Sequence, residues 1–295
     1  MNIKKLDELR LKIRNRLIIS IIVGIITFIY AINVNIIFIP LFIILSVILG
    51  ILLTSKLDKE YKYQYKKFFV ESSLKKVFTD VFYLPSGSLD KRILDYTGMV
   101  DTGDKYLSND YASGKYKNIN FIQADVTIQE RRERTDSNGN REVYYVNIFK
   151  GKWMIFDFNK KFKSDIQIRQ KNFPNARLNV YTKKFEKVEL EDVAFNKKFN
   201  VYGISAHEVF YILTPHMIER IKELEEKIDG HLLFCLIDSK LFIGINNNVD
   251  SFEPASVFLS LNEEKIDSKI NEQIKLITMF VDELELDNNL FRKVV

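Results

Sequence analysis

Residues 17–55 read LIISIIVGIITFIYAINVNIIFIPLFIILSVILGILLTS, a run of 39 residues without one charged side chain. As a single helix this run would be about 58 Å long, whereas the hydrocarbon core of a bilayer is about 30 Å thick. The pattern therefore predicts two helices that cross a membrane, with a break at 31–35, where Asn33 and Asn35 disfavour a helix. Pro40 then falls near the start of the second helix, where its missing N–H costs little. Both passes are short, so a re-entrant hairpin is the alternative.

Basic side chains flank this hairpin at both ends. Residues 1–16 carry six basic and two acidic residues, a net charge of +4, and residues 56–67 carry five basic and two acidic residues, a net charge of +3. The connecting turn is uncharged, so the positive-inside rule predicts that both termini are cytoplasmic. No small-residue cleavage site precedes the second apolar stretch, so we expect a retained anchor rather than a signal peptide. The predicted membrane-flanking residues are Arg14, Arg16, Lys56, Lys59, Lys62, Lys66 and Lys67.

The excess of basic charge is confined to these flanks. The whole chain has a net charge of +5, so residues 68–295 sum to −2. Because each Lys or Arg beside anionic lipid contributes on the order of 1 kcal/mol, we expect an anionic bilayer to be the partner of the flanks. Residues 61–69 interleave aromatic residues with lysines, as single-strand nucleic-acid binders do. An interfacial aromatic belt explains the same pattern, so we expect no nucleic-acid binding.

The hairpin divides the chain into four expected parts. These are a basic cytoplasmic N-terminus at 1–16, the transmembrane hairpin at 17–55, a juxtamembrane helix at 56–83 and a cytoplasmic domain at 84–295. The last part is long enough for one substantial core. The chain has one cysteine, Cys235, which excludes a disulfide scaffold and a multi-cysteine metal cluster.

Alternating apolar residues predict short strands in the cytoplasmic domain. Residues 84–114 are rich in Gly, Ser, Asp and Asn and are expected to be mostly loop. Strands are expected at 122–128, 143–149, 153–158, 166–168, 178–181, 188–190, 232–237 and 241–245. Turns are expected at 136–140, at Lys150-Gly151-Lys152 and at Asp238-Ser239. Local hairpins followed by helices favour an α+β domain with an antiparallel sheet.

Helix signals follow the strands. Ser205 and Glu208 have the spacing of a capping box, and Thr214-Pro215 predicts the start of a second helix. That helix carries Met217, Ile221, Leu224 and Ile228 on one face. A C-terminal helix at about 262–286 carries Ile266, Ile270, Ile274, Ile277, Val281 and Leu284 at spacings of four and three. We expect this apolar stripe to pack on its own domain.

The candidate catalytic and metal-binding patterns are all incomplete. Asp101-Thr102-Gly103 occurs once, whereas an aspartic protease needs two such carboxylates, so a surface loop is expected. The alternating oxygen ligands of 136–142 have the wrong length for a calcium loop, and Gly114-Lys115 lacks the rest of a phosphate loop. His207, His216 and His231, the paired Glu189 and Glu191, and Cys235 in an apolar run have no partner at a diagnostic spacing. We therefore expect no metal, no cofactor and no catalysis.

Several stretches together resemble the family of bacterial membrane proteins catalogued as domain of unknown function 3137. They are Asn109-Asp110-Tyr111, Gly114-Lys115-Tyr116-Lys117, Phe149-Lys150-Gly151, Asp157-Phe158-Asn159-Lys160-Lys161-Phe162, Val188-Glu189-Leu190-Glu191-Asp192, Phe199-Asn200-Val201-Tyr202, Tyr211-Ile212-Leu213-Thr214-Pro215, Leu241-Phe242-Ile243-Gly244-Ile245 and Phe252-Glu253-Pro254. The resemblance covers about residues 60–285 and implies a two-pass anchor with a cytoplasmic domain. Glu208-Val209-Phe210 departs from the expected Glu-Ala-Arg and removes a basic residue. The family supplies no activity.

The sequence thus predicts a bacterial cell-membrane protein whose cytoplasmic domain binds an unknown protein or small molecule without catalysis. A ligand-gated effector is the alternative, in which the domain senses a ligand and the hairpins assemble into a leak. Gly24 and Gly50 motivate that alternative, because small residues allow close helix approach. A homo-oligomer is compatible with both hypotheses.

Overall fold

The computed structural model describes residues 3–34, 37, 39–137, 139–157, 165–173 and 185–286. The chain divides into two compact units. The helical unit comprises Met1–Ser73 and Phe252–Ile270, and the sheet unit comprises Leu74–Ser251 and Asn271–Val295.

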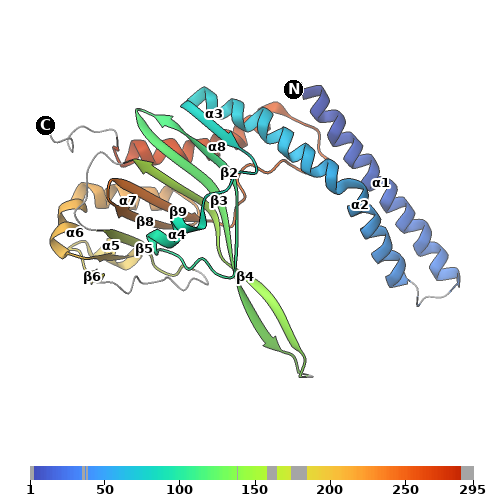
Figure 1. Ribbon diagram of the computed structural model, residues 1–295, viewed down its shortest axis with the longest axis horizontal. Helices are drawn as coiled ribbons and strands as arrows, with labels where there is room; N and C mark the ends of the chain where they lie inside the picture. Colours follow the sequence, from blue (N-terminus) through green and yellow to red (C-terminus); the bar gives the residue numbers. More distant parts are fainter. Residues whose placement is uncertain are drawn as a thin grey trace. The chain divides into compact units, whose positions relative to one another are not determined.

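Two long antiparallel helices dominate the helical unit (Figure 1). They are α1 (Ile3–Val34) and α2 (Ile39–Tyr65). The predicted break is confirmed, because α1 ends inside the segment 31–35 and Pro40 lies in the first turn of α2. Beyond α2 the chain forms a π-helical turn, η2 (Lys66–Val70), and then α3 (Glu71–Val77). The π turn places three of its side chains inside the unit, those of Lys66, Phe69 and Val70.

In the described part of the sheet unit, nine strands form one antiparallel sheet in the order β1-β2-β3-β4-β9-β8-β5-β7-β6. The strands are β1 (Thr79–Leu84), β2 (Lys105–Tyr116), β3 (Ile119–Thr135), β4 (Arg141–Asp157), β5 (Ile166–Gln170), β6 (Glu186–Val188), β7 (Phe199–Gly203), β8 (His231–Ile237) and β9 (Lys240–Asn246). The helices are α4 (Lys91–Thr97), α5 (Val193–Lys198), α6 (Ala206–Ile212), α7 (Pro215–Lys227) and α8 (Glu263–Glu283), whose first turns belong to the helical unit. The predicted α+β class is confirmed.

The sheet buries apolar side chains on both faces. One face, formed by residues such as Trp153, Cys235 and Phe242, packs with Leu94 of α4 into the main hydrophobic cluster. On the other face the ring of Phe280 in α8 lies 6.3 Å from Phe156 and 6.2 Å from Phe234, measured between ring centroids. The C-terminal part of α8 therefore covers its own domain, as its apolar stripe predicts.

The distal parts of β3 and β4 form a two-stranded arm, residues 129–147 (Figure 1). The β2–β3 pairing stops at Lys105 and Gln129, and the β4–β9 pairing begins only at Gly151. Three consecutive large side chains on the arm are exposed, those of Val143, Tyr144 and Tyr145. Its tip is the predicted turn, where Asp136 accepts hydrogen bonds from the backbone and side chain of Asn140.

The helix expected at 56–83 is shorter than predicted. It ends at Val77, and residues 79–84 form β1, which pairs with β2. Apolar residues near position 80 satisfy a helical period as well as an edge strand. Pairing with β2 decides between them, and this long-range contact leaves no mark on the local sequence.

The loop expected at 84–114 is wrong. It contains α4, which Asp90 caps through the backbone N–H of Arg92 and Gly98 ends in a left-handed conformation. It also contains most of β2, whose inward positions Asp110, Ala112 and Gly114 are small or polar. Because those residues are not hydrophobic, the strand has no visible apolar alternation.

The turn expected at 150–152 is also wrong, because β4 runs through it without interruption. A Cβ on Gly151 would lie 2.0 Å from the carbonyl oxygen of Ile245. This glycine thus permits close approach of β9 rather than a chain reversal.

The remaining predicted elements are largely present. Thr214 caps α7 as expected, by accepting from the backbone N–H of Met217 at 3.3 Å. Ser205 precedes α6, but its side chain makes no capping hydrogen bond, so the predicted capping box is incomplete. The strand expected at 178–181 lies outside the described residues.

Candidate functional site

Small side chains line the contact between α1 and α2. The hydroxyl of Ser20 donates to the backbone carbonyl of Ser46 at 2.6 Å. A Cβ on Gly24 would lie 3.0 Å from Ser46 Oγ, and a Cβ on Gly50 would lie 2.9 Å from Ser20 Oγ. Both glycines are therefore occupied in packing within one hairpin.

The outward faces of the same helices are apolar. Their exposed side chains include Ile19, Ile22, Ile25, Ile26, Ile29, Leu41, Ile44, Val47, Ile48, Ile51 and Leu52. Only 11% of the most apolar window of each helix is buried. By length and composition, both helices can cross a membrane. Small residues inside and large apolar residues outside is the arrangement that lipid, rather than water, favours.

The predicted basic residues gather at one end of the hairpin, where α1 begins and α2 ends. Arg16 donates from Nη1 to the carbonyl of Leu53 at 2.7 Å. Lys56 and Lys59 are exposed, Arg14 is half-buried, and Lys67 pairs with Glu71 at 2.9 Å. Their expected role toward a bilayer stays a prediction.

Lys62 and Lys66 both bind one carboxylate, that of Glu253. Their Nζ atoms lie 2.9 and 2.7 Å from its oxygens, and Lys66 is buried at 4% exposure. Burial alone would raise the pKa of Glu253, but the hydrogen bonds and charges of Lys66 and Lys62 lower it below the ordinary 4.5. The sequence places Glu253 far from both lysines, so this pairing was not predicted.

Glu253 begins a strap, residues 252–262, that lies against the charged end of the hairpin. Arg10 holds the strap by donating from Nη1 to the carbonyls of Val257 at 2.8 Å and Leu259 at 2.7 Å. Phe258 and Leu259 at the middle of the strap are 51% and 61% exposed. The strap therefore presents apolar side chains beside the basic residues.

The strap is expected to loosen when the Glu253 carboxylate is lost. Because the pKa of Glu253 is lower in the folded chain, the carboxylate stabilises the strap above about pH 4.5, and this contribution disappears as the pH falls through the folded-state pKa. Glu253→Gln should thus reduce hydrogen-exchange protection of residues 252–262 at pH 7, and the variant and wild type should converge below about pH 4. Glu264→Gln, an exposed change on α8, is the matched control. Equal protection of Glu253→Gln and wild type at pH 7 would contradict the assignment.

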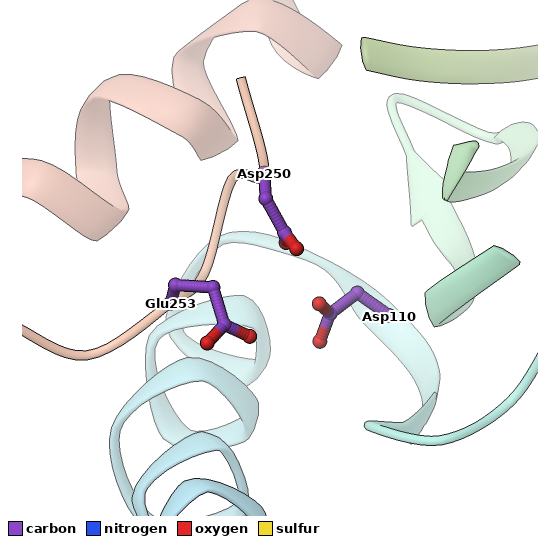
Figure 2. A group of neighbouring side chains, drawn as sticks. All are labelled: Asp110, Asp250 and Glu253. Atoms are coloured by element: carbon purple, nitrogen blue, oxygen red, sulfur yellow. The ribbon is translucent and has the colours of Figure 1, made fainter. Parts of the chain in front are cut away.

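A buried polar network lies in the sheet unit. Asp110 is fully buried at an irregular step of β2 and accepts from the Tyr83 hydroxyl and from Asn109 Nδ2, the latter at 2.8 Å. Asn109 Nδ2 also lies 3.4 Å from Asp250 Oδ1. Figure 2 shows Asp110 and Asp250, together with Glu253 of the helical unit. The donors around Asp110 account for its burial as a structural carboxylate.

A second network centres on Asp125 of β3. Asp125 accepts from the backbone N–H and hydroxyl of Ser251 at 2.6 and 3.0 Å, and it lies 3.6 Å from Lys152 Nζ. Lys152 also donates to Gln123 at 3.0 Å. All four residues are at most 3% exposed, so the network joins β3, β4 and the segment after β9 inside the core.

The incomplete catalytic patterns remain scattered within the described residues. Asp101 is exposed and accepts from the backbone N–H of Gly103 at 3.0 Å, as in a loop. His207 and His216 are exposed on α6 and α7, while His231 packs edge-on against Phe173. Glu189 and Glu191 are exposed beyond the end of β6, and Gly114 and Lys115 lie within β2. Cys235 is fully buried, and burial raises the pKa of its thiol.

A family match covers the larger part of the sheet. The family is described as "Protein of unknown function (DUF3137)", and its model matches residues 147–286. This region of the chain belongs to that family. The DUF3137 region runs from the middle of β4 to the end of α8, and it contains the resembling stretches from Phe149 onward. The resembling stretches at 109–117 precede it.

Further comparisons concern the whole chain. No curated protein matches it in sequence. The crystal structure of the mycobacterial trehalose monomycolate transport factor A, TtfA, is similar to it with a TM-score of 0.38 and 8% sequence identity, over 74% of this chain and 93% of that chain.

Proposed function

We propose that this protein is a membrane-anchored binding protein that works without catalysis. The hairpin of α1 and α2 spans the membrane, and the sheet unit carries the surface that binds a partner. The observation that carries the proposal is the inverted character of the hairpin, with small residues at its centre and large aliphatic residues on its outside. In water this surface would be an aggregation liability, whereas in a bilayer it is solvated.

Two arginines on the lipid face are expected to remove the anchor. Ile25 and Ile48 lie near the middle of the two apolar segments and are 53% and 46% exposed. An arginine at the centre of a membrane helix costs about 2.5–3.5 kcal/mol. After carbonate washing, the wild-type chain should stay in the membrane pellet, while Ile25→Arg/Ile48→Arg should appear mostly in the supernatant.

Leu107→Arg is the control for that experiment, because Leu107 is 59% exposed on β2, in the sheet unit. It should pellet like the wild type. Release of the wild-type chain by carbonate would refute membrane anchoring.

We propose that both termini lie in the cytoplasm of a bacterial cell, because the basic residues gather at the end of the hairpin away from its turn. The buried Cys235 provides an unreactive background for thiol labelling. Ile37→Cys, in the hairpin turn, should react with an impermeant maleimide in intact cells. Ser137→Cys, at the tip of the arm, should react only after permeabilisation. The reverse pattern would overturn the orientation.

The arm supports a protein as the binding partner. A two-stranded ribbon is marginally stable by itself, and tyrosine and arginine are enriched at protein interfaces. Exposed Tyr144 and Tyr145 stand beside Arg131 and Arg134 on this ribbon. A photo-crosslinker at Ser137 in native membranes should form a defined adduct that Tyr144→Ala/Tyr145→Ala abolishes. An adduct unchanged by the double substitution would count against the arm.

The ligand-gated effector remains a prediction without added support. Gly24 and Gly50, which motivated it, already pack within the hairpin. An undisturbed membrane potential after overexpression, read with a potential-sensitive dye, would eliminate it.

A further inference from the structure

A groove of about 320 Å³ lies in the helical unit, among the strap, the end of α2 and the first turns of α8. Its lining combines apolar and polar side chains, including Tyr61, Tyr65, Ser256, Leu259, Lys265 and Lys269. Every lining residue that the structure describes belongs to the helical unit.

Two buried tyrosines contribute unpaired donors to the groove. Tyr61 and Tyr65 are only 1% and 3% exposed, yet within the described part of the chain neither hydroxyl makes a hydrogen bond. Buried tyrosine hydroxyls normally have a partner. Burial raises the pKa of Tyr61 to about 12 and also raises that of Tyr65, so both groups are neutral donors at physiological pH. A bound acceptor would satisfy them.

The charge of the lining is positive. Lys265 is exposed without an ion pair in the described residues, and Lys269 donates only to the uncharged backbone carbonyl of Glu253 at 2.9 Å. The Glu253 carboxylate is bound by Lys62 and Lys66 instead. Since the described lining contains no acidic residue, the groove suits an anion.

The groove lies just beyond the uncharged part of the hairpin. Tyr61 follows Ser55 by six residues, about 9 Å along α2. The polar layer of a bilayer extends about 5–8 Å beyond each side of the hydrocarbon core. The exposed Phe258 and Leu259 of the strap beside the groove are suited to enter that layer.

We propose that this groove binds the phosphate headgroup of an anionic phospholipid from the adjoining leaflet. Tyr61 and Tyr65 donate hydrogen bonds to the phosphate oxygens, Lys265 and Lys269 supply the opposite charge, and Leu259 with Ile266 contacts the start of the acyl chains. The assignment rests on the proposed membrane anchoring for its source of ligand. It distinguishes these residues from Lys56 and Lys59, which attract anionic lipid without a shaped site.

Native mass spectrometry of the full chain in non-ionic detergent, titrated with dioleoylphosphatidylglycerol, tests this site independently of membrane fractionation. Tyr61→Phe/Tyr65→Phe retains the rings and should weaken binding about tenfold or more, as expected for two lost hydrogen bonds to a charged group. Ala255→Trp, which fills the groove without changing its charge, should weaken binding similarly. Lys56→Glu/Lys59→Glu, the charge control outside the groove, should leave the first bound lipid in place.

Three results would overturn the proposal. Equal affinity for dioleoylphosphatidylcholine would remove the anionic requirement. Equal weakening by Lys56→Glu/Lys59→Glu would reduce the effect to general attraction. Displacement of the lipid by inorganic phosphate at comparable concentration would assign the groove to a soluble phosphate compound instead. Thermal unfolding followed by circular dichroism shows whether each variant is folded, and Ala255→Trp and the tyrosine pair are separate routes to the same answer.

Discussion

Trp153→Ala is expected to lower the free energy of unfolding of the sheet unit by about 3–5 kcal/mol. Trp153 is fully buried in the main hydrophobic cluster, and its ring lies 5.7 Å from that of Phe149, measured between centroids. Across the ladder, Gly244 leaves room for the indole, since a Cβ there would lie 3.0 Å from the ring. Alanine would leave a cavity that β4 and β9, paired on both sides, cannot close.

The measurement is urea unfolding of the full chain in detergent, followed by circular dichroism because Trp153 is the only tryptophan available for fluorescence. Trp153→Phe is a graded variant. It should lose less stability, since the indole N–H has no hydrogen-bond partner in the described structure. Tyr144→Ala, an exposed aromatic truncation on the arm, should change stability by less than about 0.5 kcal/mol. A Trp153→Ala variant as stable as Tyr144→Ala would contradict this account of the core.

Asp125→Ala is expected to cost about 3–5 kcal/mol, because it removes the carboxylate beside the buried Lys152. It also removes the acceptor of the Ser251 backbone N–H, a buried donor. The same unfolding experiment measures the loss. Asp125→Asn keeps the shape and one acceptor oxygen, so it should be less harmful than alanine.

A double variant separates burial of a lone charge from loss of packing. Asp125→Leu/Lys152→Met replaces the pair with apolar side chains of similar size, which is often neutral or stabilising at buried ion pairs. We expect it to recover most of the stability that Asp125→Ala loses. If the double variant is as unstable as the single one, the ion pair is not the cause of the effect.

Prediction from sequence succeeded where the signal is local. The hairpin of α1 and α2 follows from an uninterrupted apolar run and two asparagines, and the start of α7 follows from Thr214 and Pro215. These features depend on neighbours a few residues apart, so the printed order of the chain contains them. The same holds for the β8–β9 hairpin and the stripe of α8.

Prediction failed where the environment of a residue is set by distant parts of the chain. The inward positions of β2 include Asp110 and Gly114, which are compatible with a strand only because Tyr83 supplies a hydrogen bond and the Phe121 ring lies close to the glycine. Gly151 has the composition of a turn, yet it serves close contact with Ile245 in β9. No local period distinguishes these cases from loops.

The candidate site shows the same division. The basic residues around the hairpin were predictable from charge counting, but their pairing was not: Lys62 and Lys66 meet Glu253, almost two hundred residues later in the chain. Nor could the sequence indicate that Tyr61 and Tyr65 would be buried with unpaired hydroxyls beside Lys265. A phenol next to a membrane is expected to be an interfacial anchor.

The sequence by itself determined the two apolar helices, the asymmetry of charge around them and the α+β class, because hydrophobicity and periodicity are properties of short segments. The tertiary structure alone decided that the strap returns to the hairpin, that one carboxylate occupies two of the basic residues, and that Asp125 and Lys152 meet inside the core. Electrostatic and hydrogen-bond partners are chosen by distance in space. Folding brings together residues that no spacing along the chain relates.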